Sequence, residues 1–281
     1  MRFLNYLRRN KQLGVGLIIL ISLTLFASFG RLVWDVNKAY PLAAPINKPP
    51  SLQYPFGTDS QGRDLLAAAI QGTYLTSRIG VTAGVIGLCV GVILGFLAAY
   101  YGGMVDAVIR WVVDVLLTVP GLLVLVVIAS TIREGMSVPS MALVVALLAW
   151  MWPTRTIRSQ VLILRERAFV RVAKLSGSND LVIIFTELMP NLLPYLGASL
   201  VGSVTGAIFA SLGLEALGLG PMREPTLGMT IYWMMFYSAF VRGMWWWIMA
   251  PVMIIVLIFV GLFLVSAGLD ELANPRLRRK V

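Results

Sequence analysis

The chain has 281 residues, of which 58% are hydrophobic and only 13% are charged, well away from the averages of soluble domains. It contains no histidine and a single cysteine, Cys89. This composition excludes Ser-His-Asp and Cys-His catalysis and an internal disulfide, and it removes the commonest metal ligand. The net charge is +10, but basic loops facing anionic lipid account for such an excess, so no nucleic-acid partner is needed.

Six long uncharged stretches run through the sequence. Each has 18 to 27 residues, and about 20 apolar residues suffice for a helix to cross a bilayer. They cover residues 13–30, 79–105, 115–132, 135–154, 188–214 and 243–269. The expected fold is therefore all-α, a polytopic membrane protein with six transmembrane helices. A seventh stretch, 225–241, has 17 residues and opens with Pro-Thr-Leu-Gly, which favours an interfacial or re-entrant segment.

The placement of Lys and Arg predicts the orientation of these spans. With both termini in the cytoplasm, 15 of the 23 basic residues lie on the cytoplasmic side, as the positive-inside rule favours. A seventh span would move the basic C-terminal tail outside. The expected order is a cytoplasmic tail over 1–12, a first transmembrane helix over 13–34, an extracytoplasmic loop over 35–77, a five-helix core over 78–269 and a cytoplasmic tail over 270–281.

The extracytoplasmic loop changes character at Asp59. Its first half is rich in Pro, Ala and Asn and shows no periodicity, so we expect an extended chain there. From Asp59 onward, Leu65, Leu66, Ile70 and Leu75 supply an apolar helical face. This pattern predicts an amphipathic helix lying on the outer leaflet.

A stripe of charges opens the third span, where Asp106, Arg110 and Asp114 follow one another at four-residue spacing on one helical face. Alternating signs at that spacing neutralise one another, which favours a structural salt-bridge role. Gating or a place in the substrate pathway is the alternative, because charges within a span are functional candidates. Further on, Pro120 predicts a kink, and small residues over 197–207 favour close packing of the fifth span.

Residues 155–187 form the only long polar run between two uncharged stretches in the C-terminal half. The run carries six Lys and Arg residues, and an apolar helical stripe covers 161–174. Gly177, Asn179 and Asp180 predict a stop and a restart between two helices. Composition alone leaves two interpretations, a helix held at the inner membrane surface by its charge and a helix that docks into a cytoplasmic partner.

Residues 169–177, followed by 188–194, resemble the EAA loop of binding-protein-dependent ABC transporter permeases. That family has Glu-Ala-Ala, a glycine four residues on, and Leu-Pro before the next helix, and Ala173, Gly177 and Pro190 match it. Arg171 stands in the place of the glutamate, while Val172 and Met189 replace an alanine and the leucine. The resemblance assigns the ATPase-coupling loop to Phe169, Val170, Arg171, Val172, Ala173, Lys174, Gly177 and Pro190.

Further segments resemble the oligopeptide, dipeptide and nickel permease subfamily, in matching order over about residues 53–279. They are 56–65, 101–106, 212–220 and 274–278, together with Arg110, Asp114 and Pro120. The resemblance implies the permease fold of a type I ABC importer in the plasma (inner) membrane of a prokaryote. It also implies the partners: a second homologous permease subunit, two ATP-binding subunits, an extracytoplasmic solute-binding protein and membrane lipid.

The same resemblance implies that ATP and Mg are bound by the partner subunits. This chain has no GxxxxGK[ST] motif, so we expect it to hold no cofactor or metal and to be no enzyme. Short peptides are the implied substrate class, with oligosaccharides and nickel chelates carried by close relatives. A stand-alone secondary transporter or channel is the competing class, but it predicts inverted repeats and charges spread along a pathway, and the sequence shows neither. The missing histidine disfavours a membrane-embedded enzyme.

Overall fold

The computed structural model describes residues 10–132 and 135–273. Apart from one antiparallel bridge between Thr58 and Asp64, the regular structure in these ranges is helical. In chain order the elements are α2 (Lys11–Val33), η1 (Val36–Ala39), α3 (Leu65–Tyr101), α4 (Gly103–Thr118), α5 (Gly121–Ser130), α6 (Val138–Ala149), α7 (Met151–Arg165), α8 (Ala168–Leu175), α9 (Asp180–Val182), the π-helix η2 (Ile183–Leu188), α10 (Met189–Ala216), α11 (Leu227–Phe236) and α12 (Trp245–Ala273).

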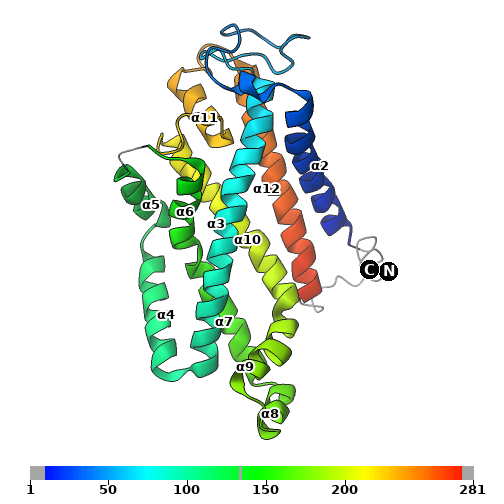
Figure 1. The fold of residues 1–281 in the computed structure, drawn as a ribbon, viewed down its shortest axis with the longest axis vertical. Coiled ribbons are helices and arrows are strands. Elements are labelled where there is room, and N and C mark those ends of the chain that lie inside the picture. Colours follow the sequence, from blue (N-terminus) through cyan, green and yellow to red (C-terminus); the bar gives the residue numbers. More distant parts are fainter. Residues whose placement is uncertain (1–9, 133–134, 274–281) are drawn as a thin grey trace.

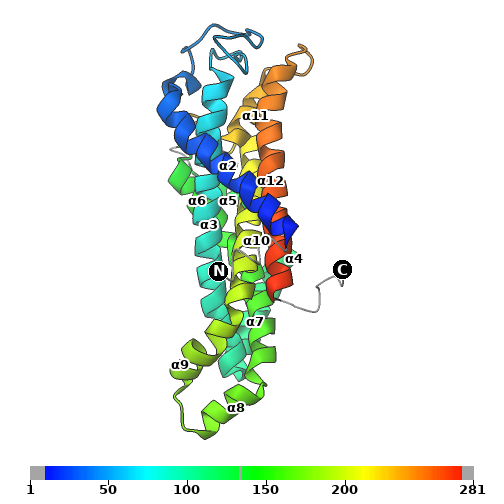
Figure 2. The same cartoon turned by 90° about the vertical axis from the view of Figure 1, so that its right-hand side faces the viewer.

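The long helices run roughly along the longest axis of the molecule, with α11 near one end and α8 at the other (Figures 1 and 2). We refer to these as the α11 end and the α8 end. The expected tails are described only over 10–12 and 270–273, where they extend α2 and α12; residues 1–9 and 274–281, including the subfamily-like segment 274–278, lie outside the described residues.

Four continuous helical runs are long and apolar enough to cross a bilayer: α2, α3, the run from α9 through α10, and α12. Two bent pairs, α4 with α5 at 82° and α6 with α7 at 42°, bring the candidates to six if each pair counts as one span. The expected all-α membrane fold is thus confirmed. The sharper break falls at Val119 and Pro120, because proline lacks the N–H that would continue the helix. Helix α11 has 10 residues, too few to span a bilayer.

Helix α3 corrects the expected boundary between the outer loop and the core. We expected a separate surface helix from Asp59 within a loop ending at residue 77. Instead, the Asp64 carboxylate caps a single helix by accepting from the Leu66 N–H (3.0 Å), and that helix continues without a break to Tyr101. Residues 67–73 are buried on every side, because their mostly small side chains let η1, α2 and α11 pack around them.

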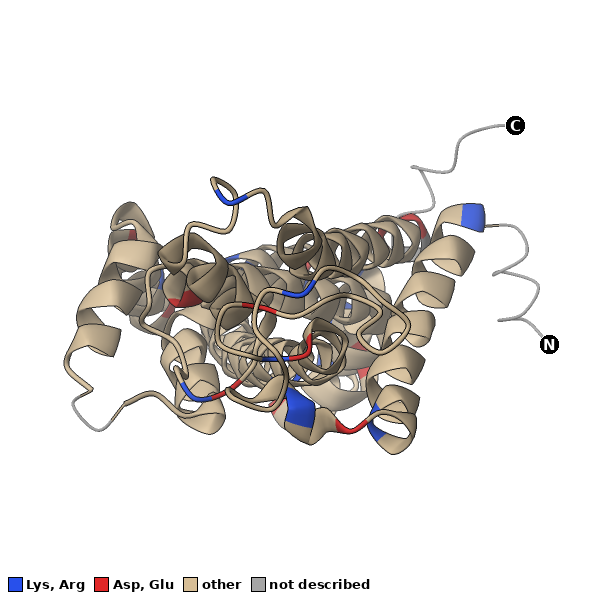
Figure 3. Ribbon diagram, turned by 90° about the horizontal axis from the view of Figure 1, so that it is seen from above, with Lys and Arg blue, Asp and Glu red and all other residues tan. Residues whose placement is uncertain are grey.

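The segment 34–64 folds over the α11 end and is stabilised by polar contacts within itself and with the rest of the chain. The guanidinium of Arg63 forms an ion pair with Asp59 (2.5 Å), and both side chains are buried. The Tyr40 hydroxyl donates to Glu224 (3.2 Å). Burial, reinforced by the charge of Glu224, raises the pKa of Tyr40, so the phenol stays a neutral donor. Viewed from above, charged segments of the ribbon lie largely on these loops and at helix ends (Figure 3).

Glycines at three- and four-residue spacing let α3 approach its neighbours closely. A Cβ built at Gly80 or Gly84 would lie 2.2 Å from Ile208 or 2.8 Å from Val204 on α10, and one at Gly87 or Gly91 would lie 2.6 Å from Ala149 or 2.5 Å from Pro153. At Gly202 and Gly206 on α10, by contrast, an added Cβ meets no atom of the described residues within 4 Å. The fifth span therefore packs closely against α3 through glycines of α3, while its own Gly202 and Gly206 take no part in close packing.

Gly84 and Gly202 form a matched pair for a stability test. Gly84→Ala is expected to lower the melting temperature of the detergent-solubilised protein, because the new methyl group meets the Val204 backbone and over-packing costs about 1–3 kcal/mol. Gly202→Ala should leave it unchanged or slightly raised, since alanine is favoured over glycine in a helix by about 0.5–1 kcal/mol. Equal melting temperatures would contradict close contact between α3 and α10 at Gly84.

Candidate functional site

Helix α8 and the turn after it contain most residues of the expected coupling loop. The polar run does not begin as a loop at residue 155, because α7 continues to Arg165. The end of α8 is a Schellman motif: the Ser178 N–H donates to the Ala173 carbonyl (3.1 Å) and the Gly177 N–H to the Lys174 carbonyl (3.0 Å). Gly177 has φ +75°, a left-handed conformation that favours glycine. The predicted stop therefore lies where the sequence placed it.

The chain restarts at α9, where the Asn179 side chain accepts from the Leu181 N–H (3.2 Å), as the sequence predicts. The helical run then passes through η2 into α10 without a loop. Pro190 is the second residue of α10, directly after the wider π-helical turns of η2, where the hydrogen-bond pattern of the continuous helical run changes.

Helix α8 presents apolar side chains on two faces. Val170 is fully buried in a cluster that includes Ile157 and Ile183, and Ala173 packs against the same cluster. On the other side, Phe169, Val172 and Leu175 form an exposed stripe at three-residue spacing, with Leu175 89% exposed. The inward face attaches α8 to the helix bundle, and the outward face leaves an apolar surface uncovered by the described residues.

Cationic side chains border this exposed stripe. Arg171 and Lys174 lie on α8, and Arg167 precedes its first residue. Arg171, which the resemblance places at a glutamate position, lies 3.8 Å from Glu166, but both side chains are well exposed, so this ion pair is weak. The acidic partner of Arg171 is therefore Glu166, which precedes α8.

The charge stripe on α4 is not neutralised within its own helix. Asp106 forms a two-pronged ion pair with Arg158 of α7, whose Nη2 lies 2.6 Å from Oδ2. Asp114 faces Arg155 of α7 at 3.9 Å, with both side chains about half exposed. Among the described residues Arg110 takes part in no ion pair within 4 Å. The expected salt bridges therefore exist, but they join α4 to α7.

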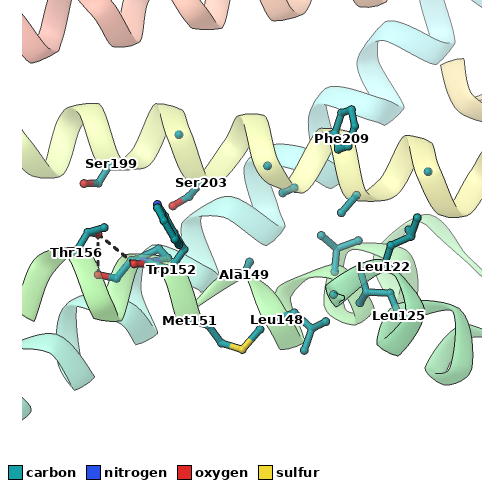
Figure 4. A pocket seen from close by; sticks show the side chains of 18 of the residues that line it. Leu122, Leu125, Leu148, Ala149, Met151, Trp152, Thr156, Ser199, Ser203 and Phe209 are labelled. Atoms are coloured by element: carbon teal, nitrogen blue, oxygen red, sulfur yellow. Dashed lines mark hydrogen bonds between the residues drawn. The ribbon is translucent and has the colours of Figure 1, made fainter. Parts of the chain in front are cut away.

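A cavity of about 610 Å³ separates α10 from α5, α6 and α7. Its α10 wall consists largely of the small residues of the fifth span, including Gly202 and Gly206, with Ser199 and Ser203 facing Trp152 and Thr156 of α7 (Figure 4). Leucine, valine and methionine side chains supply most of the remainder, and Asp270 of α12 also lines it. The arrangement offers an apolar space with a few hydroxyl groups.

Residues 91–279 match the model of the family described as binding-protein-dependent transport system inner membrane component. The chain belongs to this family. The match includes α8, the α4–α7 ion pairs and most of the cavity lining.

Among the similar permeases is the dipeptide transport system permease protein of Bacillus subtilis strain 168, 30% identical over 273 residues, which cover 97% of this chain and 84% of that protein. The dipeptide permease of Alkalihalophilus pseudofirmus is 31% identical, with 97% and 88% covered. The oligopeptide transport system permease protein of Mycobacterium bovis is 31% identical over 233 residues, with 82% and 79% covered.

As a permease of this family, the chain is a multi-pass inner membrane component of an ABC importer and not an enzyme. Dependence on a binding protein implies a solute-binding partner and an ATPase partner. The permease needs no cofactor of its own, and among the described residues no group of three His, Cys, Asp or Glu side chains could hold a metal ion.

Sequence reasoning missed the cavity and the residues that tie α8 to the bundle. The glycines and serines of α10 were the available signal, but the same spacing also suits close packing, so the sequence could not distinguish the two. Tyr100, which contacts the expected coupling loop, carried no signal at all, because its partner Asp180 is 80 residues away in the sequence.

Proposed function

We propose that this chain is one of two permease subunits of an ATP-driven importer of short peptides, with both termini and the α8 end in the cytoplasm. Helix α8, with Phe169, Val172 and Leu175 at its surface, docks into an ATP-binding subunit and couples ATP hydrolysis to alternating access. The second permease subunit and the second ATP-binding subunit complete the membrane complex.

The exposed face of α8 is the observation that carries this proposal. Helix α8 lies at the extreme end of the molecule, beyond the ends of α2 and α12 (Figures 1 and 2). Its exposed face is therefore outside the part of the bilayer that those two helices cross. This position favours docking to a protein over lying on the membrane surface. The apolar stripe with its cationic border fits a cleft that has an apolar floor and acidic side chains around it.

Similarity to the dipeptide and oligopeptide permeases supports short peptides as substrate. The cavity between α10 and α5–α7 is the part of the pathway that this chain supplies. Its serine and threonine hydroxyls can hydrogen-bond to peptide groups of varied sequence, and Asp270 is the single charged side chain among its described lining residues.

The test is reconstitution of the complete complex in proteoliposomes, with uptake of a labelled dipeptide, a labelled oligosaccharide and a nickel chelate measured side by side. We expect dipeptide uptake that requires both ATP and the binding protein. Uptake of only the sugar or the chelate would overturn the substrate class. Transport by the chain alone without ATP would overturn the importer mechanism.

The cavity can be tested with thiol labelling, because Cys89 is the chain's only cysteine and Cys89→Ser gives a cysteine-free background. In that background we expect Ser203→Cys to react with a small maleimide, and saturating dipeptide to slow the reaction several-fold in the assembled complex. Val204→Cys is the matched control, since Val204 is buried against α3 and should stay unreactive. Labelling of Ser203→Cys that dipeptide leaves unchanged would contradict a place in the pathway.

A further inference from the structure

The last turn of α3 meets the coupling loop at Tyr100. The side chain is 8% exposed and packs in the same apolar cluster as Val170 of α8 and Ile183 of η2. The ring therefore lies in the part of the bundle from which two elements extend: α8, and the continuous helical run of α9, η2 and α10.

The Tyr100 hydroxyl donates a 2.6 Å hydrogen bond to Oδ1 of Asp180. Asp180 is the first residue of α9, which continues through η2 into α10. A hydrogen bond from a hydroxyl to a carboxylate is among the stronger kinds in proteins. The Tyr100–Asp180 hydrogen bond fixes the start of the α9–α10 helical run to the end of α3.

The same ring also contacts α8. The Lys174 ammonium lies 5.3 Å from the centroid of the Tyr100 ring, within the range of a cation–π contact. Lys174 is in the last turn of α8, before Gly177, and Asp180 follows that turn. One side chain thus touches both sides of the turn that separates α8 from α10.

The backbone of Tyr100 is held as well. From α7, Nη1 of Arg165 donates to the Ala99 carbonyl (2.6 Å) and more weakly to the Tyr100 carbonyl (3.4 Å). These carbonyls belong to the last turn of α3, where a helix has no partners of its own. Tyr100 is consequently held by α7 as well as by the contacts of its own side chain.

We propose that Tyr100 is the positioning residue that transmits movement of α8 to α10, an inference that rests on the proposed docking of α8. The covalent link between the two helices passes through 176–179, an exposed turn with Gly177 in a left-handed conformation. Such a turn can bend, so a displaced α8 could move without moving α10. The Tyr100 side chain bridges the turn, with its ring against Lys174 on one side and its hydroxyl on Asp180 on the other, and makes α8, α3 and α10 shift together, which reshapes the cavity that α10 lines.

The test is Tyr100→Phe in the complete complex, measured as substrate transported per ATP hydrolysed. The ring remains, so the contacts with Lys174 and the cluster are kept and only the hydroxyl is lost. We expect transport per ATP to fall at least about fivefold, with ATP hydrolysis and complex assembly unchanged and the melting temperature lowered only slightly by the loss of one hydrogen bond. Tyr101→Phe is the control: Tyr101 is adjacent and 54% exposed, its hydroxyl forms no hydrogen bond with the described residues, and no loss is expected.

Variants of Asp180 locate the effect in this one bond. Asp180→Ala should reproduce the loss, Asp180→Asn should keep most coupling because it retains an acceptor oxygen, and Tyr100→Phe should add nothing to Asp180→Ala. Normal coupling in Tyr100→Phe, with uncoupling by Gly177→Val, would overturn the role of Tyr100 and leave docking by α8 intact. Loss of assembly in Tyr100→Phe, or ATP hydrolysis that falls together with transport, would also overturn it, in favour of a structural role. Normal coupling in both variants would overturn the docking itself.

Discussion

Gly177→Val is expected to uncouple the transporter, so that the complex hydrolyses ATP but moves little or no substrate. Gly177 has φ +75°, and a left-handed conformation costs an ordinary residue about 1–2 kcal/mol, more for one branched at Cβ. No atom of the described residues lies within 4 Å of an added Cβ, so the effect comes from the backbone and not from a clash. Relief of the strain opens the Schellman turn and changes the angle of α8, while the transmembrane helices stay in place.

Gly177→Asn is the matched control, because asparagine adopts left-handed conformations more readily than valine and should keep transport close to the unsubstituted level. Ala173→Glu tests the same element from its inner face. Ala173 packs against the apolar cluster beneath α8, so a carboxylate there is expected to lift the helix away and uncouple transport. Normal substrate transport per ATP in both Gly177→Val and Ala173→Glu would mean that α8 is not the coupling element.

The spans could be read from the sequence because a bilayer imposes a simple requirement, about 20 apolar residues without charge. That requirement says nothing about where a helix begins outside the bilayer. Residues 65–77 are moderately apolar, and a surface helix and an extension of the next span are equally consistent with their pattern. Burial on every side by η1, α2 and α11 decides between them, and those neighbours are distant in the sequence.

In the candidate site too, features set by neighbouring residues in the sequence could be predicted, whereas contacts between distant residues could not. Gly177 and Asn179 act within one turn, so their pattern predicts the end of α8 and the start of α9 correctly. The four-residue spacing on α4 predicts ion pairs within that helix. Instead, Asp106 and Asp114 pair with Arg158 and Arg155 of α7. Spacing of small residues likewise identifies α3 and α10 as candidates for close packing but does not show which one faces a cavity.

Glu215, in the last turn of α10, holds α11 in place through buried hydrogen bonds. Its side chain is fully buried, and Oε2 accepts from the Thr226 hydroxyl (2.9 Å). That hydroxyl also caps α11 by accepting from the Met229 N–H (3.2 Å). The fit is tight: a Cβ at Gly228 would lie 2.1 Å from Oε2. The carboxyl group therefore connects the end of one spanning helix to the start of the short helix at the α11 end.

Glu215→Ala is expected to destabilise the protein by about 2–3 kcal/mol, because it leaves a buried hydroxyl without its acceptor and creates a cavity at the start of α11. Glu215→Gln keeps an acceptor oxygen in the same volume and should recover at least half of that loss. The measurements are the melting temperature in detergent and the rate of proteolysis in 217–226, the segment that Glu215 ties down. Glu187→Ala is the control, since the Glu187 side chain forms no hydrogen bond or ion pair within the described residues. Equal melting temperatures and equal proteolysis rates in Glu215→Ala and Glu187→Ala would contradict this role. They would mean that α11 is held by its apolar contacts with α10, α3 and α12 alone.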